Sequence, residues 1–145
     1  MYCQAPAGTK NVPCQTSSLL SYPPEKYRKL PDPYDRNLDL NLRARAYLHS
    51  NCAQCHVLAG GGNAAIELDF LTERDKMNLF DEKPKHNTYD LPDARLVAPG
   101  KPDSSVLLYR LGHRKAGSMP PLATTVVDRE AEALIREWIK EMKPK

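Results

Sequence analysis

The chain has 145 residues, of which 41% are hydrophobic and only 7% aromatic, enough for one small domain with a modest core. Its net charge of +3 is far from the dense Lys and Arg stripes of nucleic-acid-binding proteins, so we expect no nucleic-acid partner. No apolar run approaches the roughly 20 residues that cross a bilayer, so we expect no membrane span.

The first 37 residues are rich in proline and tyrosine. Six of the 13 prolines fall in this segment, interleaved with four tyrosines. Proline at that density is incompatible with helix interiors and central strands. We therefore divide the chain into an irregular extension or linker, residues 1–37, and a folded domain, residues 38–145.

A helical pattern begins after the extension. Leu40, Ala44, Tyr47 and Leu48 recur at helical spacing. Asn51 is a reasonable stop. This helix therefore ends directly before the next motif.

That motif is Cys52-Ala53-Gln54-Cys55-His56. Two thiols at this spacing can each add across one vinyl group of a haem, and the following histidine then presents its imidazole to the iron. The motif predicts covalent haem attachment.

Three alternatives concern the same two thiols. A structural zinc site would need a second pair of ligands, and the other cysteines, Cys3 and Cys14, lie in a segment without histidine. A thioredoxin-like pair opens a helix after a strand, whereas the residues before Cys52 have a helical pattern. The third alternative is two unrelated buried cysteines.

Residues 57–95 carry weaker signals. Three glycines at positions 60–62 predict a loop. Residues 68–80 contain a short helical candidate with Leu71, Met77 and Phe80. Residues 81–87 are polar and interrupted by proline, so we expect a surface excursion that covers one edge of the haem.

Two more helices are predicted in the C-terminal third. The first begins near residue 103, passes through Val106, Leu107 and Arg110, and ends at Gly112, where glycine can adopt the left-handed cap. The second has Asp128 as its N-cap and a single apolar stripe. The residues of the stripe are Ala131, Leu134, Ile135, Trp138, Ile139 and Met142.

Between these helices lies Met119, followed by two prolines that stiffen its loop. A thioether is a soft, uncharged ligand that suits low-spin haem iron and raises its potential. We predict Met119 as the second axial ligand. The alternative is a methionine that fills a gap in the core.

Residues 38–142 resemble the class I c-type cytochromes, and more narrowly the bacterial, planctomycete-type cytochrome c domains. The pattern of those domains runs C-x-x-C-H, P-G-x-P-x-x-S-x-L, M-P-P and W-I. These four pieces stand at residues 52–56, 99–107, 119–121 and 138–139. Residues 1–37 have no counterpart in the minimal fold, and the stretch between the first two pieces is long.

The resemblance implies an all-α class I cytochrome c fold around one covalent haem c. Cys52 and Cys55 would form the thioether bonds, with His56 as the proximal ligand and Met119 as the distal ligand. The expected activity is single-electron transfer between extracytoplasmic redox partners, without enzymatic turnover.

The resemblance also assigns supporting roles. The backbone carbonyl of Pro99 would accept a hydrogen bond from the proximal imidazole and fix its orientation. Leu96 and Val97 would pack beside the ring on the proximal side. The first and last helices would cross, with Tyr47 and Trp138 as the contacts.

The remaining histidines are expected to be solvated. His49 belongs to the surface of the first helix, and His86 lies in a polar loop. His113 is the one competitor of Met119, and its binding would give a bis-histidine centre of lower potential.

Two other functions stay open. A haem enzyme or gas sensor would leave one iron position free for peroxide, oxygen or nitric oxide. A relay module would pass electrons only inside a larger complex, such as one with a fused dehydrogenase-like module. The basic residues expected around the haem edge, where they would attract acidic redox partners, are Lys83, Lys85, Arg110, Arg114 and Lys115.

Covalent haem attachment in bacteria is a periplasmic process, so we expect a periplasmic or otherwise extracytoplasmic location. The N-terminus has no charged region followed by an apolar one, so the export signal is expected to be missing from this chain. In such a compartment we favour a disulfide between Cys3 and Cys14 over two free thiols.

Overall fold

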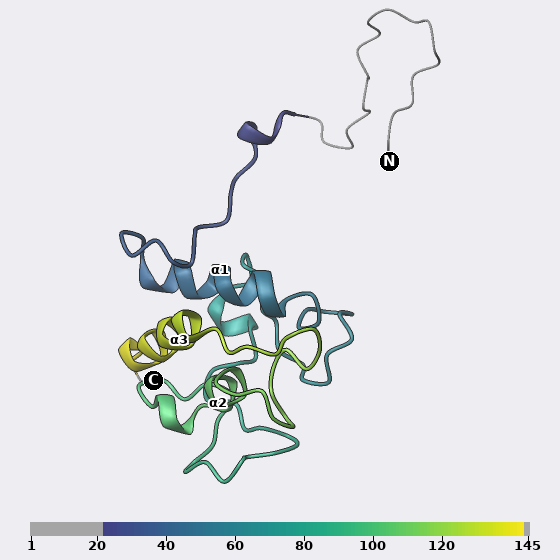
Figure 1. Cartoon of the computed structure of the whole chain (residues 1–145), viewed down its shortest axis with the longest axis vertical. Coiled ribbons are helices and arrows are strands. Elements are labelled where there is room, and N and C mark those ends of the chain that lie inside the picture. The colour runs from purple at the N-terminus through teal and green to yellow at the C-terminus, as the bar shows by residue number, and fades with distance from the viewer. Residues whose placement is uncertain (1–21, 144–145) are drawn as a thin grey trace, which may run out of the picture.

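The computed structural model describes residues 22–143, and three α-helices organise this part of the chain (Figure 1). They are α1 (Leu40–Cys52), α2 (Val106–Leu111) and α3 (Arg129–Glu141). Strand pairing among the described residues is limited to two isolated parallel bridges, Phe80 with Val97 and Arg95 with Ser105. The predicted all-α class is confirmed at this level.

Helix α1 forms where its apolar spacing predicted. Asp39 caps its N-terminus by accepting the Leu42 amide at 2.9 Å. Ala44 and Leu48 are buried in the core. The helix runs one residue beyond the predicted stop, so Cys52 is its last residue.

Helix α3 begins at the predicted cap, where the Asp128 carboxylate accepts the Ala131 amide at 2.9 Å. The whole predicted stripe is buried. Helices α1 and α3 pack against each other, and the Trp138 indole donates to the Asn41 side chain of α1 at 3.0 Å. The predicted packing of the first helix against the last is confirmed, and Tyr47 and Trp138 are both buried in the core.

Helix α2 is shorter than predicted. Residues Pro102–Ser104 form a 3₁₀ turn, and Ser105 is extended, so the α-helix starts only at Val106. The Ser105 hydroxyl accepts the Ala98 amide at 2.9 Å and donates to the Lys101 carbonyl at 3.0 Å. These bonds hold Ser105 out of the helix because they tie it to the neighbouring segment.

The helix does end at Gly112, but the predicted left-handed cap is wrong. Gly112 has φ −78°, and its amide donates to the carbonyls of Leu108 and Tyr109. The chain leaves the helix through an ordinary turn, so no positive φ is needed.

The helical candidate in residues 68–80 reduces to one 3₁₀ turn, Arg74–Lys76. Met77 is buried, whereas Leu71 is 79% exposed. The amide of Val97 donates to the Leu79 carbonyl at 3.1 Å, and the amide of Asp81 donates to the Val97 carbonyl at 2.9 Å. This pairing extends the chain where the helix was expected.

Residues 22–37 are irregular apart from a 3₁₀ turn at Pro24–Lys26, as proline density predicted. Their C-terminal part is tied to the helices. The Tyr34 hydroxyl donates to Asp128 at 2.6 Å, and the Arg43 side chain donates to the Pro33 carbonyl at 2.8 Å. The proposed disulfide between Cys3 and Cys14 lies outside the described residues.

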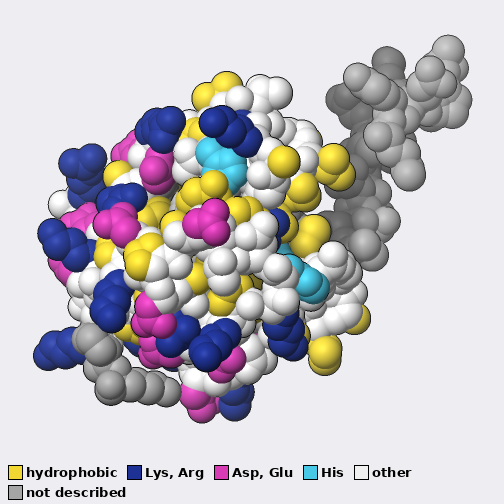
Figure 2. Space-filling view, turned by 90° about the horizontal axis from the view of Figure 1, so that it is seen from below, with side chains coloured by type: hydrophobic (Ala, Val, Ile, Leu, Met, Phe, Trp, Pro, Cys, Tyr) yellow, Lys and Arg dark blue, Asp and Glu magenta, His cyan; other side chains and the backbone are white. Residues whose placement is uncertain are grey.

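The surface mixes charges of both signs. Figure 2 shows basic and acidic side chains interspersed over one face, with hydrophobic side chains between them. Within residues 22–143, no helix combines the length and the apolar composition needed to cross a bilayer.

Candidate functional site

The two thiols and the histidine of the C-x-x-C-H motif lie at the C-terminal end of α1. After Cys52 the chain makes a tight turn, in which the amides of Cys55 and His56 donate to the Cys52 carbonyl at 3.1 and 2.9 Å. Cys52 is half-buried and Cys55 is exposed, and both are free thiols. The turn therefore brings two thiols and one imidazole to the same end of the helix.

Burial raises the pKa of the Cys52 thiol to about 11, with the nearby Cys55 acting in the same direction. A thioredoxin-type nucleophile needs the opposite, a pKa lowered by a helix N-terminus or a cation. Cys52 instead ends a helix. The geometry disfavours the reading of this pair as a redox-active dithiol.

The surroundings of His56 favour the neutral form of its imidazole. Burial lowers its pKa, and the positive charge of Arg110 adds to the effect, while the backbone of Ala64 acts against it. Its Nδ1 atom is buried and has no hydrogen-bond partner. A neutral imidazole with an unpartnered nitrogen is the form that binds a metal.

The glycine loop after the motif packs tightly against it. The Gly62 amide donates to the Cys55 carbonyl at 2.9 Å. A Cβ atom at Gly60 or Gly62 would lie 2.7 Å from that same oxygen, and one at Gly62 would also lie 2.9 Å from the His56 ring. Only glycine allows the loop to approach this closely.

A cavity of about 440 Å³ lies beside the motif, within the range of roughly 300–1,000 Å³ typical of cofactor pockets. One side is formed by the motif itself, with Cys52, Cys55 and His56. The walls are mainly apolar, which disfavours water inside. The apolar residues of the walls include Ile66, Leu68, Leu79, Leu96, Val106 and Leu107.

Met119 lines the same cavity, together with Arg110 and Arg114. Its amide donates to the Arg110 carbonyl at 2.9 Å, which anchors the Met119 loop to α2. The structure therefore brings Met119 and the distant C-x-x-C-H motif to one cavity.

Of the three residues predicted to support the haem, one lines the cavity and two do not. Leu96 lines the cavity, whereas Val97 is buried in the core and does not line it. Pro99 is also buried and is not part of the lining. Among the described residues, no hydrogen bond joins the His56 ring to the Pro99 carbonyl.

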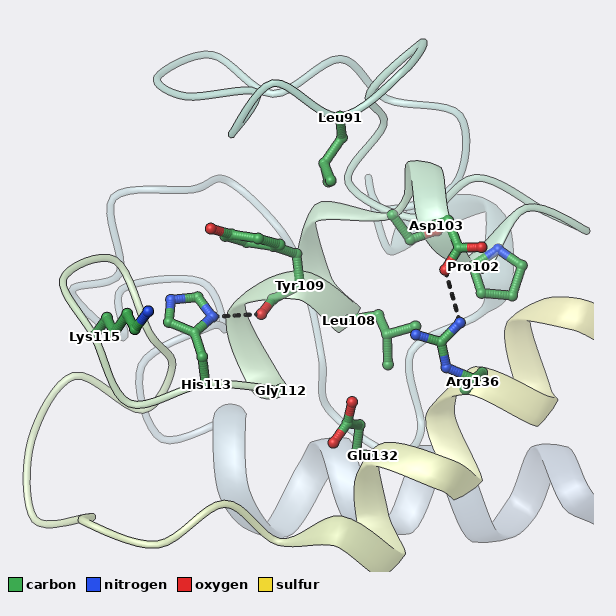
Figure 3. Close-up of a pocket in the computed structure, with 11 residues that line it drawn as sticks. Leu91, Pro102, Asp103, Leu108, Tyr109, Gly112, His113, Lys115, Glu132 and Arg136 are labelled. Carbon is green, nitrogen blue, oxygen red and sulfur yellow. Dashed lines mark hydrogen bonds and ion pairs between the residues drawn. The ribbon is translucent and has the colours of Figure 1, made fainter.

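His113 lies in a second cavity, of about 430 Å³, between α2, α3 and the loop that carries Leu91 (Figure 3). Its Nδ1 atom is 2.7 Å from the Tyr109 carbonyl, and its ring packs against the Tyr109 ring at 4.7 Å. It does not line the cavity that holds Met119. The geometry favours Met119 over His113 as a partner of His56.

The other two histidines differ from each other. His86 is exposed in its loop. His49 is half-buried rather than fully on the surface, because its Nδ1 atom accepts the Phe70 amide at 3.1 Å. This bond ties the backbone of Phe70 to α1, and His49 does not line the cavity.

Of the five basic residues, only Arg110 and Arg114 line the Met119 cavity. Lys115 lines the second cavity, and Lys83 and Lys85 are exposed on the 81–87 loop. The sequence predicts Arg110 and Arg114 only as charges around the haem edge. The one feature of the sequence that links these two arginines is their spacing of four residues directly before the Met119 loop.

Comparison with protein-family models, with curated proteins and with solved structures found no match to this chain. Within residues 22–143, no three His, Cys, Asp or Glu side chains are grouped so as to hold a metal ion.

Proposed function

We propose that this protein carries single electrons on one covalently bound haem c. The observation that carries the proposal is the meeting of residues 52–56 and Met119 at one cavity with apolar walls. A haem bound there would supply iron that alternates between the ferric and ferrous states by gaining or losing one electron.

The residues at the cavity fit such a group. Two free thiols are available for thioether bonds, and the neutral His56 imidazole has a buried nitrogen without a partner. Met119, which lines the same cavity, offers a thioether. The set therefore provides both covalent anchors and two axial ligands of suitable chemistry.

In this function the chain would bind the haem, fix its orientation and shield it from water. Cys52 and Cys55 would fix the ring to the end of α1, and the apolar walls would exclude water and lower the local dielectric. With His56 and Met119 both occupied as ligands, no site would be left for a substrate. The protein would act as a carrier and not as an enzyme.

The fold that accompanies this function is the class I cytochrome c fold, built by residues 38–145 with residues 1–37 as an extension. The packing of α1 against α3 supports it. Periplasmic or other extracytoplasmic location, and redox partners with acidic docking surfaces, belong to the same proposal.

The first test concerns covalent attachment. After maturation in a host with a cytochrome c assembly system, the haem should stay with the polypeptide through acid-acetone extraction and denaturing gel electrophoresis. Haem that leaves with the organic phase would contradict the proposal.

The second test separates a carrier from a haem enzyme or gas sensor. The oxidised protein should show the weak near-red sulfur-to-iron charge-transfer band, and Met119→Ala should abolish it, lower the potential and allow carbon monoxide to bind. Met142→Leu is the matched control, because Met142 is a buried methionine that does not line the cavity. Rapid carbon monoxide binding by the unchanged protein would favour the enzyme or sensor.

A further inference from the structure

The loop that carries Met119 is bonded to two arginines through its backbone. Arg110, on α2, donates from Nε to the Gly117 carbonyl at 2.7 Å, and its own carbonyl accepts the Met119 amide at 2.9 Å. One residue therefore holds the loop at two points, just before and at the methionine.

Arg114 joins both flanks of the same loop. Its Nη1 atom donates to the Met119 carbonyl at 3.2 Å and to the His113 carbonyl at 2.6 Å. Its Nε atom donates to the Val126 carbonyl at 3.2 Å. A single planar guanidinium thus ties together the turn after α2, the backbone of Met119 and the segment before α3.

The opposite side of the loop is equally confined. Gly117 has φ +86°, and a Cβ atom there would lie 2.8 Å from the Tyr89 hydroxyl. The Tyr89 ring packs on the Tyr109 ring of α2 at 4.8 Å. The loop is therefore enclosed between the arginines and an aromatic pair.

We infer that Arg110 and Arg114 are positioning residues that clamp the Met119 loop and present its thioether to the cavity. The inference rests on the proposed function, because it assigns the thioether the role of a ligand. Proline stiffens the loop locally, whereas the bonds of Arg110 and Arg114 fix the position of the loop relative to α2.

Arginine suits this task better than lysine for two physical reasons. Its fork of five donors can bond several carbonyls at once in a fixed plane, whereas an ammonium group is a compact point charge. Its charge also persists at any pH that the fold tolerates. The clamp should therefore depend on the shape of the side chain as well as on its charge.

The experiment compares Arg114→Lys, Arg114→Gln, Arg110→Lys and Arg110→Gln in the haem-loaded chain. The control is Arg136→Gln, which removes the surface ion pair between Arg136 on α3 and Asp103 in the 3₁₀ turn before α2. The three measurements are the sulfur-to-iron band, the rate of carbon monoxide binding, and hydrogen exchange of the Met119 amide. The last measurement reports on the loop itself and not on electron transfer.

The glutamine variants should keep the covalent haem but lose at least half of the intensity of the sulfur-to-iron band. Carbon monoxide binding and exchange of the Met119 amide should each become at least tenfold faster. The lysine variants should show the same changes, because charge without the fork does not restore the bonds. The control should match the unchanged protein in all three measurements.

If an arginine variant does not accumulate, Gly117→Ala displaces the same loop from its other side and should give the same loss of band. Variants that retain the band, the slow carbon monoxide binding and the slow exchange would overturn the inference. An unchanged protein without the band would contradict ligation by Met119, and faster exchange in the arginine variants would still establish the clamp.

Discussion

Replacing Asp128 with Ala should remove two interactions at once, because its two carboxylate oxygens serve different partners. One oxygen caps α3 through the Ala131 amide at 2.9 Å, and the other accepts the Tyr34 hydroxyl at 2.6 Å. Loss of the cap costs about 1 kcal/mol. A hydrogen bond to a charged group contributes about 1.5–3 kcal/mol when buried, and we reduce this to about 1 kcal/mol because Tyr34 is 39% exposed.

These magnitudes define a double-mutant cycle. Asp128→Ala should lower the free energy of unfolding by about 2 kcal/mol, Tyr34→Phe by about 1 kcal/mol, and the double variant by no more than Asp128→Ala alone. Asp128→Asn should resemble Tyr34→Phe, because the amide oxygen keeps the cap. The matched control is Tyr27→Phe, since Tyr27 is also 39% exposed and, among residues 22–143, its hydroxyl accepts a hydrogen bond only from the amide of Tyr22 in the extension.

The assay is urea unfolding of the haem-loaded chain, followed by circular dichroism at neutral pH. The control should change the free energy of unfolding by less than about 0.5 kcal/mol. Additive effects of Asp128→Ala and Tyr34→Phe, with no coupling of about 1 kcal/mol, would refute the shared-carboxylate reasoning. Coupling would also establish that the end of the 1–37 segment packs as part of the folded domain.

Three further predictions concern the extension, the glycine loop and the surface. Burial and the bond to Asp128 raise the pKa of Tyr34 above its usual value of 10.0. The stabilisation by this hydroxyl should therefore be complete below pH 10 and decline at higher pH. Urea unfolding of Tyr34→Phe and of the unchanged protein at several pH values measures this decline. Gly62→Ala should reduce the yield of covalently loaded protein at least tenfold on a haem-stained gel, because its Cβ would lie 2.7 Å from the Cys55 carbonyl oxygen. The control is Gly61→Asn, which should leave the yield near normal because a Cβ atom at Gly61 has open space around it. Electron transfer with an anionic reagent should be faster than with a cationic one at low salt. The two rates, measured by stopped flow, should converge as added salt screens charges beyond about 8 Å. Equal salt dependence of the two rates would mean that the basic residues do not steer redox partners.

The sequence determined the features that depend on neighbours along the chain. Helices α1 and α3 followed from apolar spacing, and the α3 cap at Asp128 followed from a side chain three residues before the amide that it accepts. The C-x-x-C-H motif could be recognised from sequence for the same reason, since one turn of chain brings its thiols and imidazole together. Such contacts span three or four positions, so local pattern contains them.

Tertiary structure decided what depends on distant segments. Ser105 leaves the helix because it bonds to Ala98 and Lys101, and residues 79–81 are extended because they pair with residue 97. The Tyr34 bond to Asp128 and the four carbonyls bonded by Arg114 join segments that no periodicity connects. A side chain's propensity says what it can bond, but only packing selects which backbone groups come within reach, and this is why the cavity and its arginine clamp were visible only in the folded chain.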